Sequence, residues 1–422
     1  MYRETVERLL LEDCSEGEYL FPASEYCISN VPETALSVLD ESFDRPLPGD
    51  VFDGVSTDVE NVLLLVLDGY GLDRWKRDYR DDPFLEGLTD GGTVTPLTSV
   101  YPSETAAALT TLYTGLEPTE HGLLGWYQYL ESAGEDVVTL PFTTLEGEPL
   151  FEVAPDAEAR DLFEGEPLSV RAAEAGIDAH AILPDAYVDS GYSRAVTAGA
   201  ERTGYDTAAD FAYAIRRVLE DASGPTSVHA YQPTLDEIAH EEGTGTDRYR
   251  ANLASITDCL RRELLEELEP ETAKRTLLVL TADHGIVNTV PEENVALTTQ
   301  EWWPRLEETF RRDADGSARL PTGSPRNTHF YVRPDRLEDA QEILEAGIDG
   351  CVFTRGEALE RGLFGCAHPS KLFERRCGDL VAVHRNRGLC WHESDRWMVG
   401  MHGGLTHEEM LVPLAIGRLD AL

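Results

Sequence analysis

The sequence predicts an α/β protein with a mostly parallel central sheet flanked by helices and a small α/β cap inserted into it. Near-continuous apolar runs of strand length, NVLLLVL at 61–67 and TLLVL at 276–280, are typical of strands buried on both faces. Helical and strand-like segments alternate at the spacing of βαβ units. Polar residues follow the apolar runs at once, as they do at the carboxyl edge of such a sheet.

Three units follow from the pattern along the chain. Residues 1–57 are expected to be an N-terminal extension packed on the core, because an amphipathic helix leads into a loop rich in Pro, Gly and Asp. Residues 58–295 and 396–422 are expected to form the catalytic core. Residues 296–395, where short strands and helices alternate, are expected to form the inserted cap.

Within the core, helices are expected at 168–175, 206–220 and 249–268, and strands at 179–183 and 227–231. Residues 125–148 carry several aromatic side chains among Gly, Thr and acids, which predicts a long irregular loop. Residues 410–415 are expected to be a final edge strand.

The composition excludes several classes of protein. The formal charge of -44 is spread along the whole chain and resembles proteins of salt-loaded cytoplasm, as in halophilic archaea. Such a surface repels duplex nucleic acid. No apolar run is long enough to span a bilayer, and the acidic N-terminus is unlike a signal peptide, which predicts a cytoplasmic protein. Seven scattered cysteines without CxxC spacing argue against a disulfide framework and a zinc-thiolate site. The sequence indicates no particular oligomeric state.

The stretch 101–122, YPSETAAALTTLYTGLEPTEHG, predicts a loop that enters a helix. Turn and capping residues precede an Ala-rich run, and Gly115 with Pro118 marks its end. Thr105 therefore lies near a helix N-terminus, where free N–H groups and the helix dipole favour an oxyanion. Taken alone, the stretch is better explained as a capped core helix.

Carboxylates and imidazoles recur where strands are expected to end. Asp68 follows the run at 61–67, and Asp283 with His284 follows the run at 276–280. Asp236 and His240 lie four apart on a helical turn and can bind one metal together.

His402 lies in a Gly-flanked loop. Together with the Thr105 hydroxyl these residues predict a two-metal site. Acid and imidazole ligands without cysteine suit Zn²⁺, with Mn²⁺ as the second choice.

The order of these motifs resembles the nucleotide pyrophosphatase/phosphodiesterase family of the alkaline phosphatase superfamily. The resemblance rests on VLDGYG at 66–71, YPSET and YTGLEPTEHG within 101–122, DEIAH at 236–240, TADHG at 281–285 and MHGG at 401–404. It implies an alkaline phosphatase-like core and hydrolysis of small-molecule phosphodiesters, including nucleotide pyrophosphates.

The resemblance also implies roles. Thr105 would be the nucleophile that becomes transiently phosphorylated. Asp236, His240 and His402 would hold the metal ion that activates water. The other ion, which activates the nucleophile, would be held by Asp68, Asp283, His284 and the Thr105 oxygen. Ser103, two residues earlier, is a rival hydroxyl.

Two positions depart from the nucleotide-cleaving members. Trp126 stands where they have an Asn that holds the phosphate, and Ala106 stands where they often have an aromatic for base stacking. Trp126 and Tyr127 are expected, with Ala106, to contact the substrate instead. A phosphomonoesterase or a phosphoglycerate mutase-like enzyme on the same scaffold is one alternative. A non-catalytic α/β binding protein is another.

Overall fold

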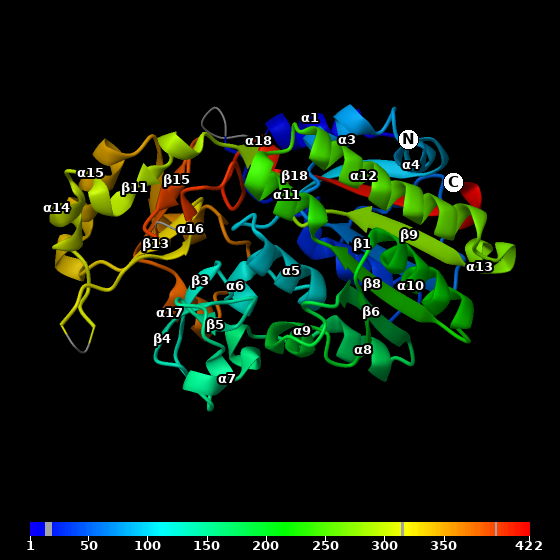
Figure 1. The fold of residues 1–422 in the computed structure, drawn as a ribbon, viewed down its shortest axis with the longest axis horizontal. Helices are drawn as coiled ribbons and strands as arrows, with labels where there is room; N and C mark the ends of the chain where they lie inside the picture. The colour runs from blue at the N-terminus through cyan, green and yellow to red at the C-terminus, as the bar shows by residue number, and fades with distance from the viewer. Residues whose placement is uncertain (13–18, 314–315, 393–394) are drawn as a thin grey trace.

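Seven strands form the central sheet in the computed structural model, which describes residues 1–12, 19–313, 316–392 and 395–422 (Figure 1). Their order across the sheet is β2 (Thr93–Thr98), β18 (Leu411–Arg418), β9 (Thr276–Thr281), β1 (Asn61–Leu67), β8 (Thr226–Gln232), β6 (Asp178–Pro184) and β7 (Glu201–Tyr205). The neighbours from β9 to β7 pair in parallel, whereas β18 is antiparallel to both of its neighbours. The expected mostly parallel sheet is confirmed.

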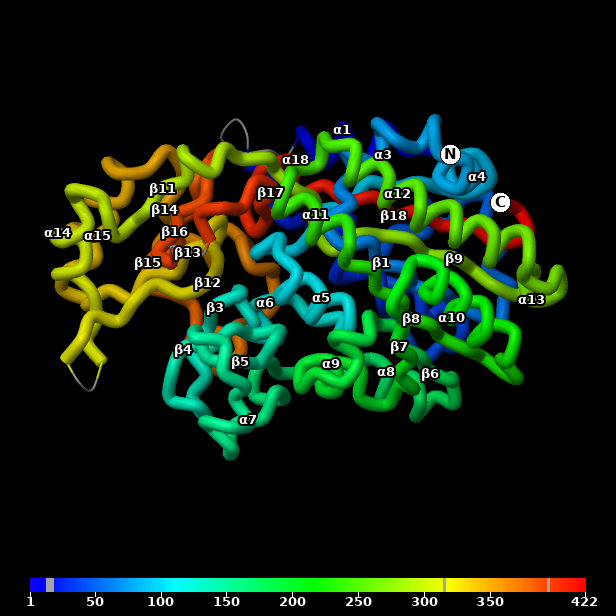
Figure 2. The backbone as a smooth tube through the Cα atoms, viewed as in Figure 1, coloured from blue at the N-terminus to red at the C-terminus, as the bar shows by residue number. Residues whose placement is uncertain are grey.

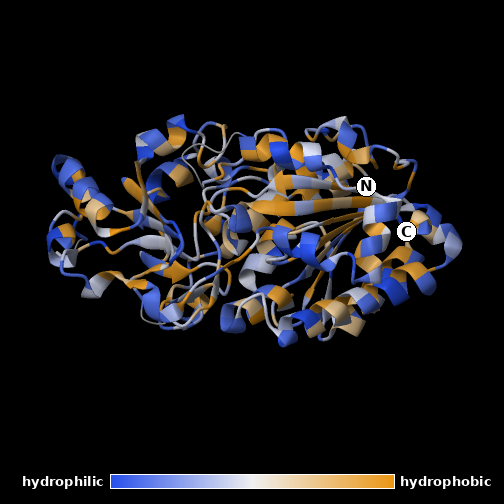
Figure 3. Cartoon of the chain, turned by 90° about the horizontal axis from the view of Figure 1, so that it is seen from above, coloured by the Kyte–Doolittle hydropathy of each residue, from blue (hydrophilic) through white to orange (hydrophobic). Residues whose placement is uncertain are grey.

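The apolar runs become the central strands because both of their faces are covered by helices. Every residue of β1 and β9 is buried, and Figure 3 shows apolar strands between helices with polar outer faces. On one face lie α3 (Leu72–Asp78), α4 (Pro83–Gly91), α10 (Ala208–Asp221), α11 (Thr234–Glu242) and α12 (Asp247–Leu260). On the other lie α2 (Val31–Leu36), α5 (Thr105–Thr114), α8 (Leu168–Glu174) and α9 (Gly191–Val196).

The expectation of a final edge strand is wrong, because β18 lies inside the sheet between β2 and β9. The fold tolerates Pro413 at this interior position of the sheet. Pro413 faces Pro96 of β2 and lies beyond the end of the pairing with β9, so no ladder hydrogen bond needs its missing N–H.

A second seven-stranded sheet lies at the other end of the molecule (Figure 2). Its order is β14 (Gly350–Thr354), β15 (Leu380–His384), β13 (Asn327–Phe330), β12 (Thr322–Ser324), β3 (Tyr127–Leu130), β4 (Glu135–Val138) and β5 (Thr143–Thr144). Residues 127–144 therefore form strands, and the expectation of an irregular loop is wrong. Their strands have at most four residues, and β3 joins the sheet by pairing with Gly323, almost two hundred residues away, which no local pattern reveals.

Short elements complete the fold. Helices α14 (Trp303–Glu307), α15 (Leu337–Gly347), α16 (Arg355–Glu360) and α17 (Lys371–Arg376) accompany the second sheet. The remaining short elements are α6 (Pro118–His121), α7 (Leu150–Val153), α13 (Pro270–Lys274), α18 (His407–Met410), β11 (Val295–Ala296) and β16 (Leu389–Cys390).

The N-terminal segment covers the β2 edge of the central sheet. α1 (Glu4–Glu12) packs against β2, and Tyr2 forms a bridge with Val94. Among the described residues, no helix is both long and apolar enough to cross a membrane. None of the six cysteines in the described ranges is in a disulfide, and Cys14 lies outside them.

The chain leaves the core for the second sheet and returns from it on adjacent strands. β10 (Val287–Asn288) pairs with β17 (Gly400–Met401) in a two-stranded ribbon. This ribbon follows β9 directly and leads back toward β18. Several connecting segments meet at the carboxyl edge of the central sheet, because the strands from which they come are parallel and β18 is antiparallel to them. They are the segments after β1, β2, β8 and β9 and the segment before β18.

Candidate active site

Thr105 is the first residue of α5, as expected, but the N-cap residue Glu104 makes no side-chain capping hydrogen bond. The helix ends at Gly115, which adopts φ 72°. The Thr105 side chain lies 3.1 Å from the ring of His284 (Thr105 Oγ1 to His284 Nε2). The Ser103 hydroxyl is engaged elsewhere, because it donates to the carbonyl of Gly404 at 2.7 Å. The geometry therefore favours Thr105 over Ser103 as the reacting hydroxyl.

The residues after β1 and β9 form a first group. His284 Nε2 lies 3.4 Å from Asp68 Oδ1 and 3.3 Å from Asp283 Oδ2. All three side chains are buried. His284 donates from Nδ1 to the carbonyl of Gly285 at 3.1 Å, so the lone pair on Nε2 faces the two carboxylates.

Asp236 and His240 on α11 meet His402 from the returning loop in a second group. His240 Nε2 lies 3.0 Å from Asp236 Oδ2 and 3.3 Å from His402 Nε2. His402 Nε2 is 3.6 Å from Asp236 Oδ1. The carbonyl of Gly400 accepts from His240 Nδ1 at 2.7 Å and holds the ring with Nε2 toward the group.

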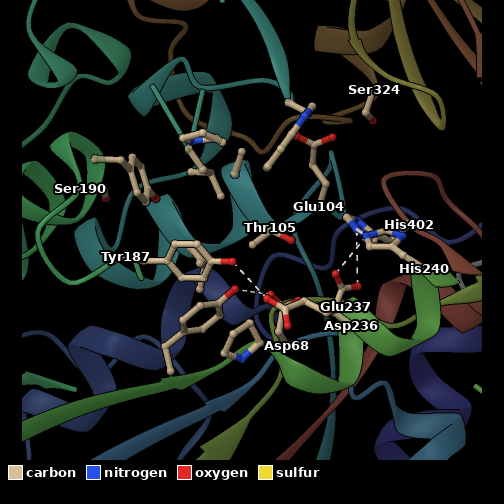
Figure 4. Close-up of a pocket in the computed structure, with 18 of the residues that line it drawn as sticks. Asp68, Glu104, Thr105, Tyr187, Ser190, Asp236, Glu237, His240, Ser324 and His402 are labelled. Carbon is tan, nitrogen blue, oxygen red and sulfur yellow. Dashed lines mark hydrogen bonds and ion pairs between the residues drawn. The ribbon is translucent and has the colours of Figure 1, made fainter. Parts of the chain in front are cut away.

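The two groups are contiguous. The rings of His284 and His402 stack with centroids 3.7 Å apart and an interplanar angle of 14°. Figure 4 shows Thr105 beside Asp68, with Asp236, His240 and His402 on one side of the cavity. All six predicted acid and imidazole residues thus lie together with the Thr105 hydroxyl.

The donor set fits divalent cations. One carboxylate oxygen each of Asp68, Asp236 and Asp283 is buried and finds no hydrogen-bond partner in the described part of the chain. Ligand atoms of Asp68, Asp283 and His284, and likewise of Asp236, His284 and His402, lie within 4.8 Å of one another. Buried oxygens without partners are costly unless a cation or a donor meets them. These clusters could therefore hold metal ions.

The pKa values of the three carboxylates also bear on cation binding. Burial raises the pKa of Asp68 well above its ordinary value, and the neighbouring Asp283 and Asp236 raise it further. Burial also raises the pKa of Asp283. Burial opposes the ionisation of Asp236 as well, but His240 and His402 outweigh it and lower its pKa. A bound cation would keep all three carboxylates ionised.

Gly69 permits the two groups to approach. It adopts φ +67°, and a Cβ at this position would lie 2.6 Å from Ile286 Cδ1 and 3.0 Å from Asp236 Oδ1. Its N–H donates to Asp283 Oδ1 at 3.2 Å. A side chain here would push Asp236 out of place.

A cavity of about 600 Å³ opens over Thr105. Ala106, Trp126 and Tyr127, which the sequence predicts as substrate contacts, all line it. Trp126 is 37% exposed, whereas Tyr127 is largely buried and donates from its hydroxyl to Asp395 at 2.8 Å. The cavity is large enough for a whole organic phosphoester.

Sequence reasoning missed several residues around this site. The Tyr231 hydroxyl donates to Asp68 Oδ2 and fixes that carboxylate. Glu104 is 2% exposed and lines the cavity, yet neither of its oxygens has a hydrogen-bond partner in normal geometry. Burial raises the pKa of Glu104 to about 7, against a smaller opposing effect of the Ser324 hydroxyl. The position of Glu104 directly before Thr105 was the one signal available in the sequence.

A buried ion pair supports the loop that carries His402. Arg326 donates to Glu409 from Nε at 2.8 Å and from Nη2 at 2.6 Å. Glu409 also accepts from the backbone N–H of Gly404 at 2.9 Å and from the Thr406 hydroxyl at 2.7 Å. Arg326 lies next to the second sheet, so this pair ties that sheet to the catalytic loop.

Comparisons with known proteins bear on the family and the fold. Residues 62–405 match the family model described as type I phosphodiesterase/nucleotide pyrophosphatase. No curated protein matches the chain significantly in sequence.

Solved structures with the same fold include murine ectonucleotide pyrophosphatase/phosphodiesterase 5, with a TM-score of 0.62 and 17% identity over 85% of this chain and 89% of that chain. An inactive variant of the murine protein in complex with AMP is equally similar, with a TM-score of 0.62, 17% identity and the same coverage. Phosphonoacetate hydrolase from Sinorhizobium meliloti, in complex with phosphonoacetate, has a TM-score of 0.61 and 17% identity over 86% of this chain and 94% of that chain.

Proposed function

The chain belongs to the type I phosphodiesterase/nucleotide pyrophosphatase family and is a phosphoester hydrolase, and from that premise we propose that it cleaves phosphodiesters through a phosphothreonine formed on Thr105. The observation that supports this is the convergence of Asp68, Asp236, Asp283 and three histidines on one hydroxyl at the N-terminus of α5, in the floor of a cavity. A nucleotide pyrophosphate is one substrate of this chemical type.

We assign the ligands to two ions. Asp236, His240 and His402 would hold one ion. Asp68, Asp283, His284 and the Thr105 oxygen would hold the other. Nitrogen and oxygen donors without thiolate suit Zn²⁺ best and Mn²⁺ next. When bound, such ions lower the pKa of a hydroxyl or a water and offset charge on phosphoryl oxygens.

The reaction takes place in two displacements. The Thr105 hydroxyl gives its proton to solvent, its oxygen attacks phosphorus, and the bond to one ester oxygen breaks; that oxygen takes a proton from solvent and leaves as an alcohol. Water then attacks the phosphothreonine diester, the bond to Thr105 Oγ1 breaks, Thr105 Oγ1 regains a proton that the water supplies, and a phosphomonoester leaves. The N–H groups of the first turn of α5 point at the phosphoryl oxygens and stabilise their charge in both steps.

The decisive experiment compares hydrolysis of bis-p-nitrophenyl phosphate with that of p-nitrophenyl phosphate in molar KCl with added Zn²⁺ or Mn²⁺. We expect the diester to be preferred and Thr105→Ala to abolish turnover. Thr298→Ala, which removes an exposed threonine hydroxyl, is the matched control and should keep full activity. Acid quenching during turnover should trap a phosphoryl group on Thr105.

Each competing function has a distinct result in this experiment. Preference for the monoester would favour a phosphomonoesterase or a mutase-like enzyme. Equal activity of wild type and Thr105→Ala would refute the nucleophile. Absence of bound metal together with no activity after metal addition would favour a binding protein.

Two further expectations stay predictions. The division into an N-terminal extension (1–57), a core (58–295 and 396–422) and a cap (296–395) is supported by the second sheet, although residues 127–144 also join that sheet. A salt-loaded cytoplasm as the place of action is supported by the formal charge of -44.

A further inference from the structure

The cavity continues well beyond the metal-binding residues, along α5. Thr105, Leu109 and Tyr113 are spaced four apart, so they lie on one face of the helix, and all three line the cavity. Eight residues of α-helix correspond to about 12 Å. The cavity therefore has an arm that leads away from the reacting hydroxyl. We call this arm, between α5 and the segment from Leu183 to Val196, the α5 arm.

The walls of the α5 arm are apolar. Leu109, Leu183 and Val196 line it and are almost completely buried by their surroundings. Ala106 and Ala186, which are small, leave space between these larger side chains. Apolar surface of this kind binds by removing apolar area from water.

Two hydroxyls beside the arm are engaged within the protein. The Tyr192 hydroxyl lies 2.8 Å from Thr110 Oγ1, and Tyr187 donates to Glu237 at 3.1 Å. The Tyr113 hydroxyl has no hydrogen-bond partner among the described residues, but its oxygen is buried by protein atoms. A polar group that entered the arm would lose its water without gaining partners.

The charges around the cavity disfavour a polyanion. Among the described residues that line it, Arg326 is the only arginine or lysine. Its hydrogen bonds go to Glu409 and to the carbonyls of His384, Arg385 and Arg387. Glu237 adds negative charge to the wall. A second phosphate in the arm would meet no free cation.

The mouth of the cavity carries exposed aromatic side chains. Trp126, Tyr187 and Trp397 line the cavity and are 37%, 43% and 54% exposed. Figure 4 shows Tyr187 and Ser190 on the side of Thr105 opposite His240 and His402, so this part of the wall belongs to the arm and not to the metal site. Exposed aromatic surface at the edge of a cavity suits an apolar ligand.

We propose that the substrate is a monoanionic phosphodiester in which one ester group is uncharged and apolar, and that this group lies in the α5 arm. The proposal rests on the proposed phosphodiesterase function and names its substrate class. Pyrophosphates and other polyphosphates, which the phosphodiesterase chemistry alone would allow, should be cleaved less efficiently than such a diester.

The test uses p-nitrophenyl phosphodiesters whose second ester group is methyl, butyl or octyl, so that the leaving group stays constant. We expect kcat/KM to rise about fourfold for each methylene that enters the arm. The p-nitrophenyl ester of thymidine monophosphate should be turned over less efficiently than the octyl ester. Leu109→Trp should block the arm and abolish the dependence on chain length.

Leu9→Trp on α1 is the matched control, because Leu9 is 49% exposed and far from the cavity; the dependence on chain length should be unchanged. If Leu109→Trp does not fold, as judged by circular dichroism, Ala186→Trp at the exposed mouth replaces it and should reduce the octyl-to-methyl ratio.

The outcomes test the apolar substrate class and the phosphodiesterase function separately. Hydrolysis of all diesters with no dependence on chain length, or with the nucleoside ester preferred, would overturn the apolar substrate class and leave the phosphodiesterase function standing. No hydrolysis of any diester with either metal would overturn both. An unchanged chain-length dependence in both blocked variants would refute the α5 arm as the binding position.

Discussion

Replacing Arg326 with methionine should destabilise the protein strongly. The guanidinium and Glu409 are 1% and 0% exposed, and Arg326 also donates to the carbonyls of His384 and Arg387 at 2.8 Å. Removing the arginine leaves a buried carboxylate without its cation and several carbonyls without donors. Loss of one partner of a buried pair costs about 3–5 kcal/mol. We expect a loss of that size in the free energy of unfolding.

The assay is urea denaturation, because urea leaves the ionic strength constant while the midpoint is measured. Arg326→Met, Glu409→Leu and the double variant form a cycle. The double variant should be less destabilised than the sum of the single variants, by about 1–3 kcal/mol. Arg217→Met is the control, since Arg217 pairs with Asp221 at side-chain exposures of 45% and 69% and should cost less than about 1 kcal/mol.

Two results would refute this reasoning. The first is a loss below about 1 kcal/mol for Arg326→Met, the range of surface pairs. The second is strict additivity in the cycle, which would mean that the two side chains act independently.

Glu409 also accepts hydrogen bonds from Gly404 and Thr406 in the loop that carries His402. Arg326→Met should therefore need more added metal than wild type for half-maximal activity.

Four other perturbations test the site and its support. Tyr231→Phe removes the donor to Asp68 and should weaken metal binding about 10–100-fold, measured by metal titration of activity. At about pH 8, where Glu104 with its pKa of about 7 is ionised, Glu104→Gln removes a buried negative charge from the cavity wall and should raise the ratio of monoester to diester hydrolysis, because a dianion is repelled more than a monoanion; an unchanged ratio would contradict this. His121 accepts from the Leu123 N–H, and its burial, more than the nearby arginine, lowers its pKa to about 3. Below about pH 6.5 the His121 imidazole is protonated in the unfolded chain but stays neutral in the folded protein. The free energy of unfolding should therefore decrease as the pH falls, and His121 should account for about 2 kcal/mol of this decrease at pH 5. In urea midpoints at pH 5 and pH 7, His121→Gln should show a smaller decrease than wild type. Finally, the melting temperature should rise between dilute and molar KCl, and a flat or falling dependence would refute the halophilic interpretation.

The central sheet and its ligands were predictable because their signals are local. A strand buried on both faces needs a continuous apolar run, and β1 and β9 have one. Asp68 and Asp283 follow these runs directly, so the carboxyl edge of a parallel sheet brings them together. The turn residues before the Ala-rich run likewise indicate where α5 starts, although no side-chain cap forms there.

The rest depends on contacts between distant segments. β3 to β5 are short, and they exist because they extend the second sheet. The interior position of β18 depends on pairing with both β2 and β9. Glu104 and Arg326 are ordinary charged residues in the sequence, and only their burial reveals that one lines the cavity and the other supports the His402 loop.

The ribbon of β10 and β17 has a consequence for how relatives can diverge. Because the inserted segment starts and finishes on paired strands, its length is free to change while His284 and His402 keep their separation. Each doubling of a closed loop costs only about 0.6 kcal/mol in chain entropy. Ser324, Arg326 and Trp397 belong to this segment and line the cavity. Changes in the cavity-lining parts of this segment, outside the Arg326–Glu409 pair and the pairing with β3, would therefore alter the substrate range while the hydrolytic centre stays the same.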